Sequence, residues 1–392
     1  MPACPLARSL IDNTGSTVKT DDLKAIVIGE DFSVLHEADV EFDVDLPEFR
    51  TAGGVVRGTD RGEVIAPPLL WVKALDMVMD RLVVAGVDFS IIEAVSGAGQ
   101  QHGSVWWSKD AEAKLGKLSP DEFLHTQLAT AFVSDSPVWM DSSTTADCKA
   151  LEEAVGAEEL SKITGSRAYE RFTGPQIRKM FRKRPRVYQA AARISLVSSF
   201  ACSLLAGKIA PIDLADGSGM NLLDIRTMQW DEKCLQACGD ESLSTKLGTP
   251  VPTATVVGSI SLRLRSGWVG LSLGTSDTLL LGLQAPAAPP AGHVLVGPTP
   301  DAPYMALLCF ANGIYYDTAE IVPRAGAGRW LQDGAGRGVE RAAPQFEARA
   351  LLEGQALARR AHAEDMGFKL GKLLYPKLVY TLQNSSVGVI PK

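Results

Sequence analysis

Hydrophobic and polar positions alternate along residues 23–45, LKAIVIGEDFSVLHEADVEFDVD, and this period of two predicts three short strands with a turn after the first. Apolar residues then recur every three to four positions over 67–86, PPLLWVKALDMVMDRLVVAG, between an initial proline and a final glycine. That spacing predicts an amphipathic helix. A short apolar run at 91–99 ends in glycines and predicts a buried strand.

The alternation of strands and helices continues along the chain. Residues 143–156 predict a capped helix, and 195–207 predict a nearly all-apolar and therefore buried helix. The segment 265–281, RSGWVGLSLGTSDTLLL, predicts a β-hairpin. Residues 322–345 are rich in Gly, Ala and Arg and predict a loop or linker, and a helix is expected at 346–367. Strands alternating with helices predict an α/β fold.

Composition limits the class of protein. The chain has 392 residues, of which 46% are hydrophobic and 22% charged, enough for about two or three domains. A net charge of −7 argues against general nucleic-acid binding, which relies on neutralising phosphates. No run of about 18 apolar residues and no secretory signal occurs, and the six cysteines form no CxxC motif. We expect a cytoplasmic protein that binds neither nucleic acid nor membranes.

A basic stretch at 178–186, RKMFRKRPR, has two interpretations. Six basic residues in nine could form a nucleic-acid or targeting patch. However, Ile177, Met180 and Phe181 fall at helical spacing, and the chain as a whole is acidic. This pattern favours a solvated helix face.

The segment 96–107, SGAGQQHGSVWW, offers the most informative polar residues. A buried strand ends in glycines and is followed by Gln100, Gln101 and His102. Ligands of open α/β sheets bind at the carboxyl ends of strands, and uncharged amide and imidazole groups suit the hydroxyls of a polyol. The alternative is a surface loop with an incidental histidine.

Three further polar residues have both a structural and a functional interpretation. Arg171, in GSRAYERFTG, is either a solvated loop charge or a donor to sugar hydroxyls. Asp141 precedes a predicted helix, where Asp commonly caps, and is also a candidate sugar contact. Asp216 lies in a Gly-rich turn, where a carboxylate is ordinarily structural.

The tip of the predicted hairpin reads GTSDT. It is either a tight turn or an anion cradle, in which Gly274 allows close approach and Thr275 and Ser276 add donors for a phosphate. The sequence contains no GxxxxGK[ST], HExxH or GxSxG motif, and no GxGxxG follows a strand. These absences remove the commonest nucleotide, zinc-protease and hydrolase signatures.

Taken together, these motifs resemble the FGGY class of carbohydrate kinases and, within it, the eukaryotic xylulose kinases. The resemblance runs from about residue 23 to 257 and continues in pieces to about 368. It is carried by SGAGQQHGSVWW, SPVWMDSSTTADC, ITGSRAYERFTGPQI, RISLVSSFACSLLAGKIAPIDLADGSGMNLLDI, SLGTSDTLLL, YMALLCFANG and LLEGQALARRAHAE.

The resemblance implies a two-domain fold of the actin and ribonuclease-H kind, with a sugar-binding domain at 1–257 and an incomplete ATP-binding domain at 258–392. It implies that Gln101, His102 and Arg171 bind the sugar and that the 274–276 tip approaches the phosphates of ATP. The implied reaction is transfer of the γ-phosphoryl group of Mg-ATP to the 5-hydroxyl of D-xylulose, a small ketose.

The sequence departs from the family pattern in three places. The family's Gly-Asp-Asn motif, whose Asp is the catalytic base, occurs nowhere in the chain. DNTGSTVKTDDLKAIV stands in place of an Asp-x-x-Thr-Gln hairpin, and LLYPKLVYTLQNSSVGVIPK in place of a Gly-Gly-x-Ser turn at the adenine site. The alternative to an active kinase is therefore an impaired sugar-binding paralogue or a truncated or internally deleted product, and the identity of the catalytic residue is open.

Overall fold

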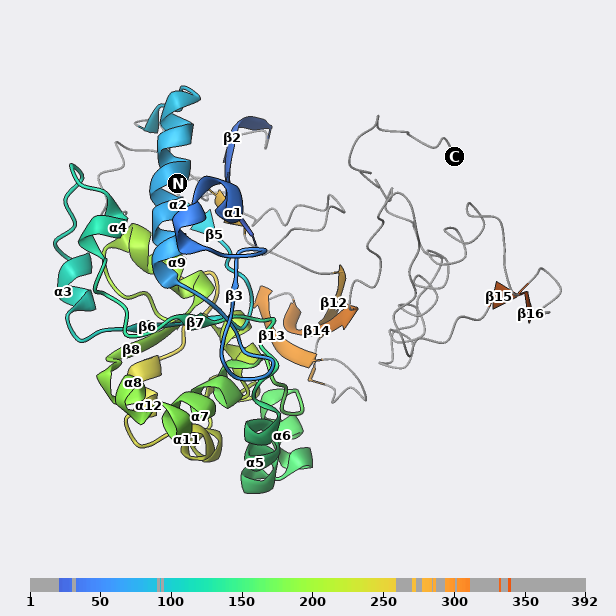
Figure 1. The fold of residues 1–392 in the computed structure, drawn as a ribbon. Helices are drawn as coiled ribbons and strands as arrows, with labels where there is room; N and C mark the ends of the chain where they lie inside the picture. The colour runs from blue at the N-terminus through green and yellow to red at the C-terminus, as the bar shows by residue number, and fades with distance from the viewer. Residues whose placement is uncertain are drawn as a thin grey trace, which may run out of the picture.

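The computed structural model describes residues 21–29, 33–89, 92, 95–258, 270–272, 277–283, 285–286, 293–299, 302–310, 331–332 and 338–339. Helices pack around several small sheets in the part numbered up to about 258, and later strands lie beside it (Figure 1). The predicted α/β class is confirmed by this mixture of elements.

One sheet contains four strands in the order β2-β1-β11-β5. Strand β1 (Asp22–Ile28) pairs antiparallel with β2 (Val34–Glu41) on one side and with β11 (Gly270–Ser272) on the other. Strand β11 runs parallel to the short β5 (Ser96–Gly97). A strand almost 250 positions later in the sequence thus separates two strands of the N-terminal part.

The predicted third strand in 23–45 is wrong. Phe42–Asp45 form the short helix α1, and Pro47–Phe49 form a 3-10 turn, η1. The Asp45 carboxylate accepts a hydrogen bond from the Glu41 backbone N–H at 2.8 Å and pairs with Arg81 at 2.6 Å. These local contacts favour a helical turn over continued extension.

The predicted amphipathic helix at 67–86 is confirmed as α2 (Pro68–Val84). It packs against β1 and β2 and closes a core with them. The buried face contains the expected residues Leu70, Trp71, Ala74, Leu75, Val78 and Leu82. Burying such side chains contributes about 1.5–3 kcal/mol each, which fixes the helix on this sheet.

The predicted hairpin at 265–281 is wrong in its pairing. Both strands exist, but β12 (Asp277–Leu283) pairs antiparallel with β14 (Ala302–Phe310), and β14 also pairs with β13 (His293–Thr299). Strand β11, by contrast, belongs to the first sheet. For β12, a ladder along all seven of its residues with β14 replaces the local pairing. The tip, 273–276, lies outside the described residues.

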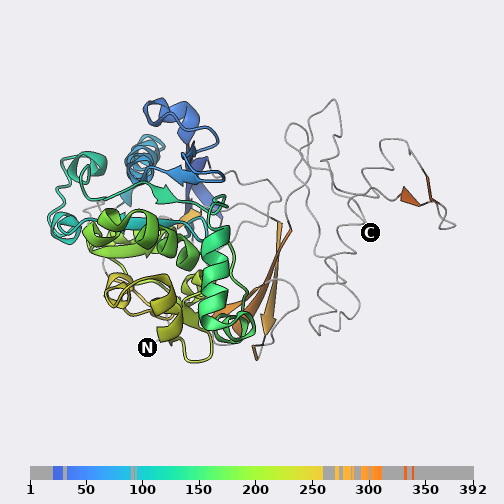
Figure 2. The same ribbon diagram turned by 60° about the horizontal axis from the view of Figure 1, so that its bottom comes forward.

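A second core surrounds β6 (Ser104–Trp107) and β8 (Arg193–Leu196), which pair antiparallel. Helices α5 (Thr145–Val155), α7 (Thr173–Lys183) and α11 (Glu232–Cys238) pack together beside it (Figure 2). Cys234 and Cys238 are buried in this core as free thiols.

The helices expected at 143–156 and 195–207 are present as α5 and as α9 (Val197–Ala206). The first ends at Gly156 and the second at Gly207, both with positive φ. The strand expected at 91–99 is limited to β5 in the described part.

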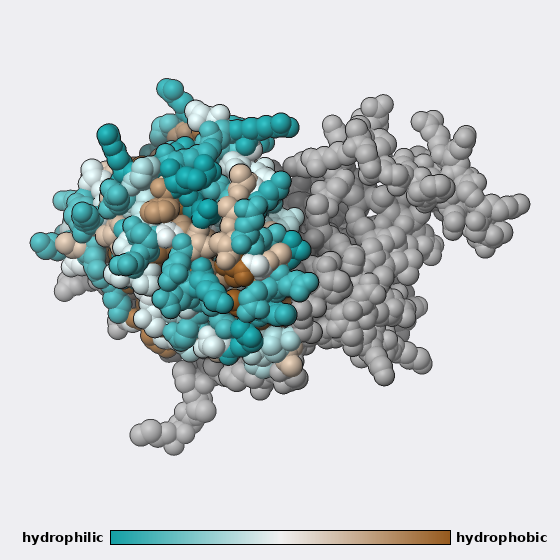
Figure 3. Space-filling view, turned by 90° about the horizontal axis from the view of Figure 1, so that it is seen from below, coloured by the Kyte–Doolittle hydropathy of each residue, from teal (hydrophilic) through white to brown (hydrophobic). Residues whose placement is uncertain are grey.

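The basic stretch lies mostly on α7, as the helical spacing predicts. Ile177 and Met180 are buried, whereas Phe181 is exposed. Several basic side chains pair with carboxylates of the chain, such as Arg182 with Asp147 at 3.2 Å. Viewed from the end where α5, α7 and α11 lie, the described surface is mostly hydrophilic (Figure 3).

The remaining elements are short. The strands are β3 (Val56–Arg57), β4 (Val64–Ala66), β7 (Ser136–Pro137), β9 (Leu223–Asp224), β10 (Gln229–Trp230), β15 (Leu331–Gln332) and β16 (Gly338–Val339). The helices are α3 (Ala111–Leu115), α4 (Leu124–Gln127), α6 (Ala157–Thr164), α8 (Pro185–Ala190), α10 (Leu214–Gly217), α12 (Leu243–Leu247) and the 3-10 turn η3 (Ser218–Met220). Strands β15 and β16 pair within the predicted linker 322–345, and the helix predicted at 346–367 lies outside the described residues.

Strand β13 joins the later part of the chain to the earlier part. Val294 and Val296 form a small core with Leu214, Leu223 and Ile225. The predicted boundary between residues 257 and 258 stays a prediction. In the structure, β11 and β13 both pack on elements from before that boundary.

Candidate functional site

His102 occupies a constrained position between β5 and β6. Its φ is 69°, a conformation that costs a non-glycine residue free energy and is held here by surrounding contacts. Its backbone carbonyl accepts a hydrogen bond from Thr173 Oγ1 at 3.0 Å, and the residue is only 7% exposed.

The proton of the His102 ring is fixed by its partner. Nδ1 lies 3.1 Å from the carbonyl oxygen of Gly219, which can only accept, so Nδ1 carries the hydrogen. Burial, followed by the charges of Arg171 and His293, lowers the pKa of His102 to about 3. The ring is neutral near pH 7, and Nε2 is therefore a hydrogen-bond acceptor.

The glycines of this region permit close contacts. A Cβ on Gly219 would lie 3.3 Å from His102 Cε1 and 3.6 Å from Gln101 Nε2, so Gln101 and His102 converge on the same turn. A Cβ on Gly99 would lie 2.5 Å from the backbone N of Ser198, closer than any real Cβ contact. Close contacts at both positions thus explain why Gly99 and Gly219 are glycines.

Arg171 lies in the segment that joins α6 to α7. Its guanidinium carbon is 4.6 Å from the centre of the Tyr169 ring, and the next residue, Phe172, stacks on His102 with ring centres 4.6 Å apart. The structure therefore brings the predicted residues Gln101, His102 and Arg171 into one neighbourhood, although about 70 positions separate the two loops.

This arrangement can recognise a neutral polyol. It combines an imidazole acceptor, a guanidinium with five donors and amide side chains. The side-chain oxygen of Gln100 is buried and has no hydrogen-bond partner in the described part of the chain. An unsatisfied buried acceptor costs free energy, which a bound hydroxyl could recover.

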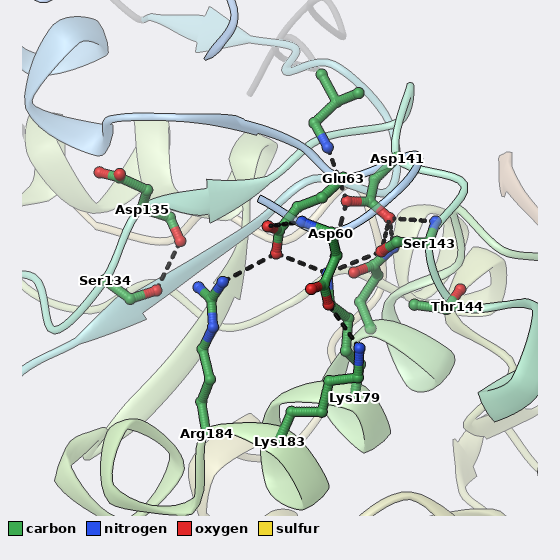
Figure 4. Close-up of polar contacts among 12 residues, drawn as sticks. Asp60, Glu63, Ser134, Asp135, Asp141, Ser143, Thr144, Lys179, Lys183 and Arg184 are labelled. Carbon is green, nitrogen blue, oxygen red and sulfur yellow. Dashed lines mark hydrogen bonds and ion pairs between the residues drawn. The ribbon is translucent and has the colours of Figure 1, made fainter. Parts of the chain in front are cut away.

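Asp141 is enclosed by protein donors (Figure 4). Its carboxylate accepts hydrogen bonds from the backbone N–H groups of Val64 and Ser143, both at 2.9 Å, from Ser143 Oγ at 2.6 Å and from Gln176 Nε2 at 2.8 Å. These contacts give Asp141 a structural role, because they join β4, the loop before α5, and α7. Its contact with sugar stays a prediction.

A buried ion pair lies next to Asp141. Lys179 Nζ is 2.7 Å from Glu63 Oε1 and 2.7 Å from Ser143 Oγ, and Arg184 is 3.0 Å from the same Glu63 oxygen (Figure 4). Burial alone would raise the pKa of Glu63, but Lys179 and Arg184 hold it below its ordinary value. Sequence spacing gave no sign of this network, because its members come from distant segments.

Asp216 is a titratable carboxyl group close in sequence to Gly219, whose carbonyl oxygen lies at hydrogen-bond distance from His102 Nδ1. It lies in α10, three positions before Gly219, and accepts a hydrogen bond from Ser198 Oγ at 2.5 Å. Burial, followed by repulsion from Asp213, raises the pKa of Asp216 to about 7. The hydrogen bond with Ser198 agrees with a structural role for this carboxylate.

The residues predicted to contact the phosphates of ATP, Gly274, Thr275 and Ser276, are not among the described residues. Within the ranges that the structure describes, no group of three His, Cys, Asp or Glu side chains could hold a metal ion. In the same ranges, no helix has the length and apolar character that crossing a bilayer requires.

Comparison with known sequences supports the sugar-kinase resemblance. Residues 127–279 match the FGGY family of carbohydrate kinases, N-terminal domain. Xylulose kinase of Rattus norvegicus is 43% identical over 422 aligned positions, which cover 91% of this chain and 78% of the relative. The chain belongs to the FGGY family of carbohydrate kinases. Xylulose kinase 2 of Arabidopsis thaliana is 39% identical, with 90% and 77% covered.

Solved structures confirm the fold of this FGGY chain. A xylulose kinase from Brucella ovis superposes with a TM-score of 0.58 at 17% identity, covering 74% of this chain and 59% of the other. The xylulose kinase of Rhodospirillum rubrum also gives 0.58, at 12% identity, covering 75% and 59%. This chain thus matches about three fifths of each of these two proteins. The predicted sugar-kinase fold is confirmed.

Proposed function

We propose that this FGGY chain binds D-xylulose and transfers the γ-phosphoryl group of ATP to its 5-hydroxyl, giving D-xylulose 5-phosphate. The substrate is suggested by relatives named xylulose kinase that are 39–43% identical over about nine tenths of the chain. The ketose class agrees with the hydrogen-bond donors and acceptors that Gln101, His102 and Arg171 supply.

The observation that carries the proposal is the neutral His102 beside Arg171. With Nδ1 held by the Gly219 carbonyl, His102 accepts a hydrogen bond from a sugar hydroxyl at Nε2. Arg171 and Gln101 donate to other hydroxyl oxygens. Together they would hold the sugar in one orientation, and positioning is the main contribution of a protein to phosphoryl transfer.

ATP and Mg²⁺ belong to the proposal as co-substrate and cofactor. Gly274, Thr275 and Ser276 are the residues of this chain that would contact the phosphates, through backbone N–H groups and hydroxyls. Bound Mg²⁺ neutralises phosphate charge in such reactions. The described residues form no metal cluster of their own, so no step is assigned to the ion.

We place the protein in the cytoplasm, consistent with its free cysteines, and propose no nucleic-acid or membrane partner.

A second candidate function is sugar binding without phosphoryl transfer. The sequence contains no Gly-Asp-Asn motif, which supplies the catalytic base in the family that this chain resembles. Loss of a general base lowers a rate by about 10²–10⁴-fold. Asp216, whose pKa of about 7 suits proton transfer, is the first residue to test as a replacement.

Turnover and binding should be measured on the same preparation. A coupled assay with Mg-ATP and D-xylulose reports transfer, and calorimetry with D-xylulose alone reports binding. We expect His102→Ala to abolish sugar binding. The control His125→Ala, on α4 and within hydrogen-bond distance of Asp76 on α2, should preserve it. Binding without turnover would select the second function, and absence of both in a folded protein would refute both.

A further inference from the structure

A second buried histidine, His293, lies beside the sugar-binding residues. It begins β13, is only 8% exposed, and comes from the part of the chain assigned by sequence to the ATP-binding domain. Its ring centre is 4.9 Å from that of Phe172 and 5.8 Å from that of Tyr169. These two residues flank Arg171 on either side, so His293 contacts the segment that carries the proposed sugar-binding cation.

The hydrogen bond of His293 has a defined direction. Ser166 Oγ lies 2.8 Å from the Arg167 carbonyl oxygen and 2.7 Å from His293 Nδ1. A carbonyl accepts only, so the hydroxyl gives its single hydrogen to Arg167. His293 Nδ1 therefore donates to Ser166 Oγ. Burial, followed by the charge of Arg171, lowers the pKa of His293 to about 4, which agrees with a neutral ring.

Strand β13 is held firmly enough to fix this ring. The Val294 N–H donates to the Gly165 carbonyl at 3.0 Å, and the Val296 N–H donates to Ser218 Oγ at 3.0 Å. A Cβ on Gly165 would lie 2.1 Å from Val294 O, so only glycine permits this approach. The strand thus contacts both the start of the Arg171 segment and the η3 turn that holds His102.

We propose that His293 is a positioning residue of the sugar pocket: it holds the segment Ser166–Phe172 in place and so sets where Arg171 and the Phe172–His102 stack lie. One end of the segment is fixed by the hydrogen bond to Ser166, and the other by ring contacts with Tyr169 and Phe172. A residue of the later part of the chain thereby controls sugar affinity. The effect on xylulose rests on the proposed function.

Two variants separate the two kinds of contact. His293→Asn keeps a donor near the Nδ1 position and loses the ring, whereas His293→Phe keeps the ring and loses the donor. His125→Ala is the control, because it removes a partly buried histidine of α4 whose partner, Asp76, lies on α2 and not in the segment. Hydrogen exchange of the unliganded full chain reports the segment directly, through the Ala168 and Phe172 amides bonded to Glu152 and Tyr169.

We expect both His293 variants to exchange these amides faster than the wild type. We also expect the Kd and KM for D-xylulose to rise about threefold to tenfold, the loss of one hydrogen bond or ring contact, with the KM for ATP unchanged. His125→Ala should change neither the exchange of these amides nor the Kd and KM for D-xylulose.

Wild-type exchange in both variants would overturn the proposal, as would faster exchange with unchanged sugar affinity. If the wild type binds no D-xylulose, the proposed function fails. The exchange data then decide the positioning role alone: faster exchange supports it, and unchanged exchange overturns it. His293→Asn is the milder variant and serves if His293→Phe does not fold.

Discussion

The buried ion pair between Glu63 and Lys179 of α7 gives the sharpest test of which contacts stabilise this fold. Lys179 is 4% exposed and Glu63 2% exposed, and Asp141 Oδ2 lies 3.9 Å from the same ammonium group. Lys179→Met preserves side-chain length and removes the charge. Two buried carboxylates then lose their shared cation, although Glu63 keeps Arg184 at 3.0 Å.

The expected cost is large. Removing one partner of a buried pair destabilises a protein by about 3–5 kcal/mol, and because Arg184 remains, we expect the lower end of that range. The control is Lys183→Met on the same helix, whose partner Asp60 is exposed at the surface. Exposed pairs are screened by water and contribute little, so the control should unfold nearly like the wild type.

Urea unfolding followed by tryptophan fluorescence measures both variants. The folded pKa of Glu63 lies below its ordinary value of 4.5, so the stabilisation is present above about pH 4.5 and is lost as pH falls through the folded value. The difference in the free energy of unfolding between the wild type and Lys179→Met should therefore decrease as the pH falls. Equal unfolding of Lys179→Met and Lys183→Met at pH 7 would refute the reasoning.

Three further outcomes follow from the site. Gly219→Ala places a methyl group 3.3 Å from His102 Cε1 and should weaken D-xylulose binding severalfold in calorimetry without preventing folding; unchanged affinity would contradict the contact. The folded pKa of His102 is depressed, so the unfolded chain binds more protons between about pH 3 and 6.5; wild-type stability should rise with pH there more steeply than that of His102→Gln. The folded pKa of Asp216 is raised to about 7, so wild-type stability should fall from about pH 4 to 7 relative to Asp216→Asn, and parallel pH profiles would exclude the raised pKa.

Local sequence determined the elements whose signals are short-range. Helix α2 follows from its apolar spacing, its proline and its final glycine, and α5 and α9 end at glycines with positive φ as their sequences indicate. The motif residues Gln101, His102 and Arg171 were identified from their segments alone, and the structure brings them together. Their roles in sugar binding stay predictions.

Only the tertiary structure decided which distant segments meet. The apolar pattern of 265–281 predicts two strands, yet β11 and β12 pair in different sheets. Strand β12 pairs with β14 along all seven of its residues, whereas β11 joins β1 and β5. The sequence around Asp141 predicts a helix cap or a sugar contact, but in the structure its carboxylate accepts hydrogen bonds from Val64 and Gln176. His293 and Ser166 are 127 positions apart, and no spacing rule links them. Periodicity reports which face of an element is buried, whereas packing of the whole chain selects the partner that buries it.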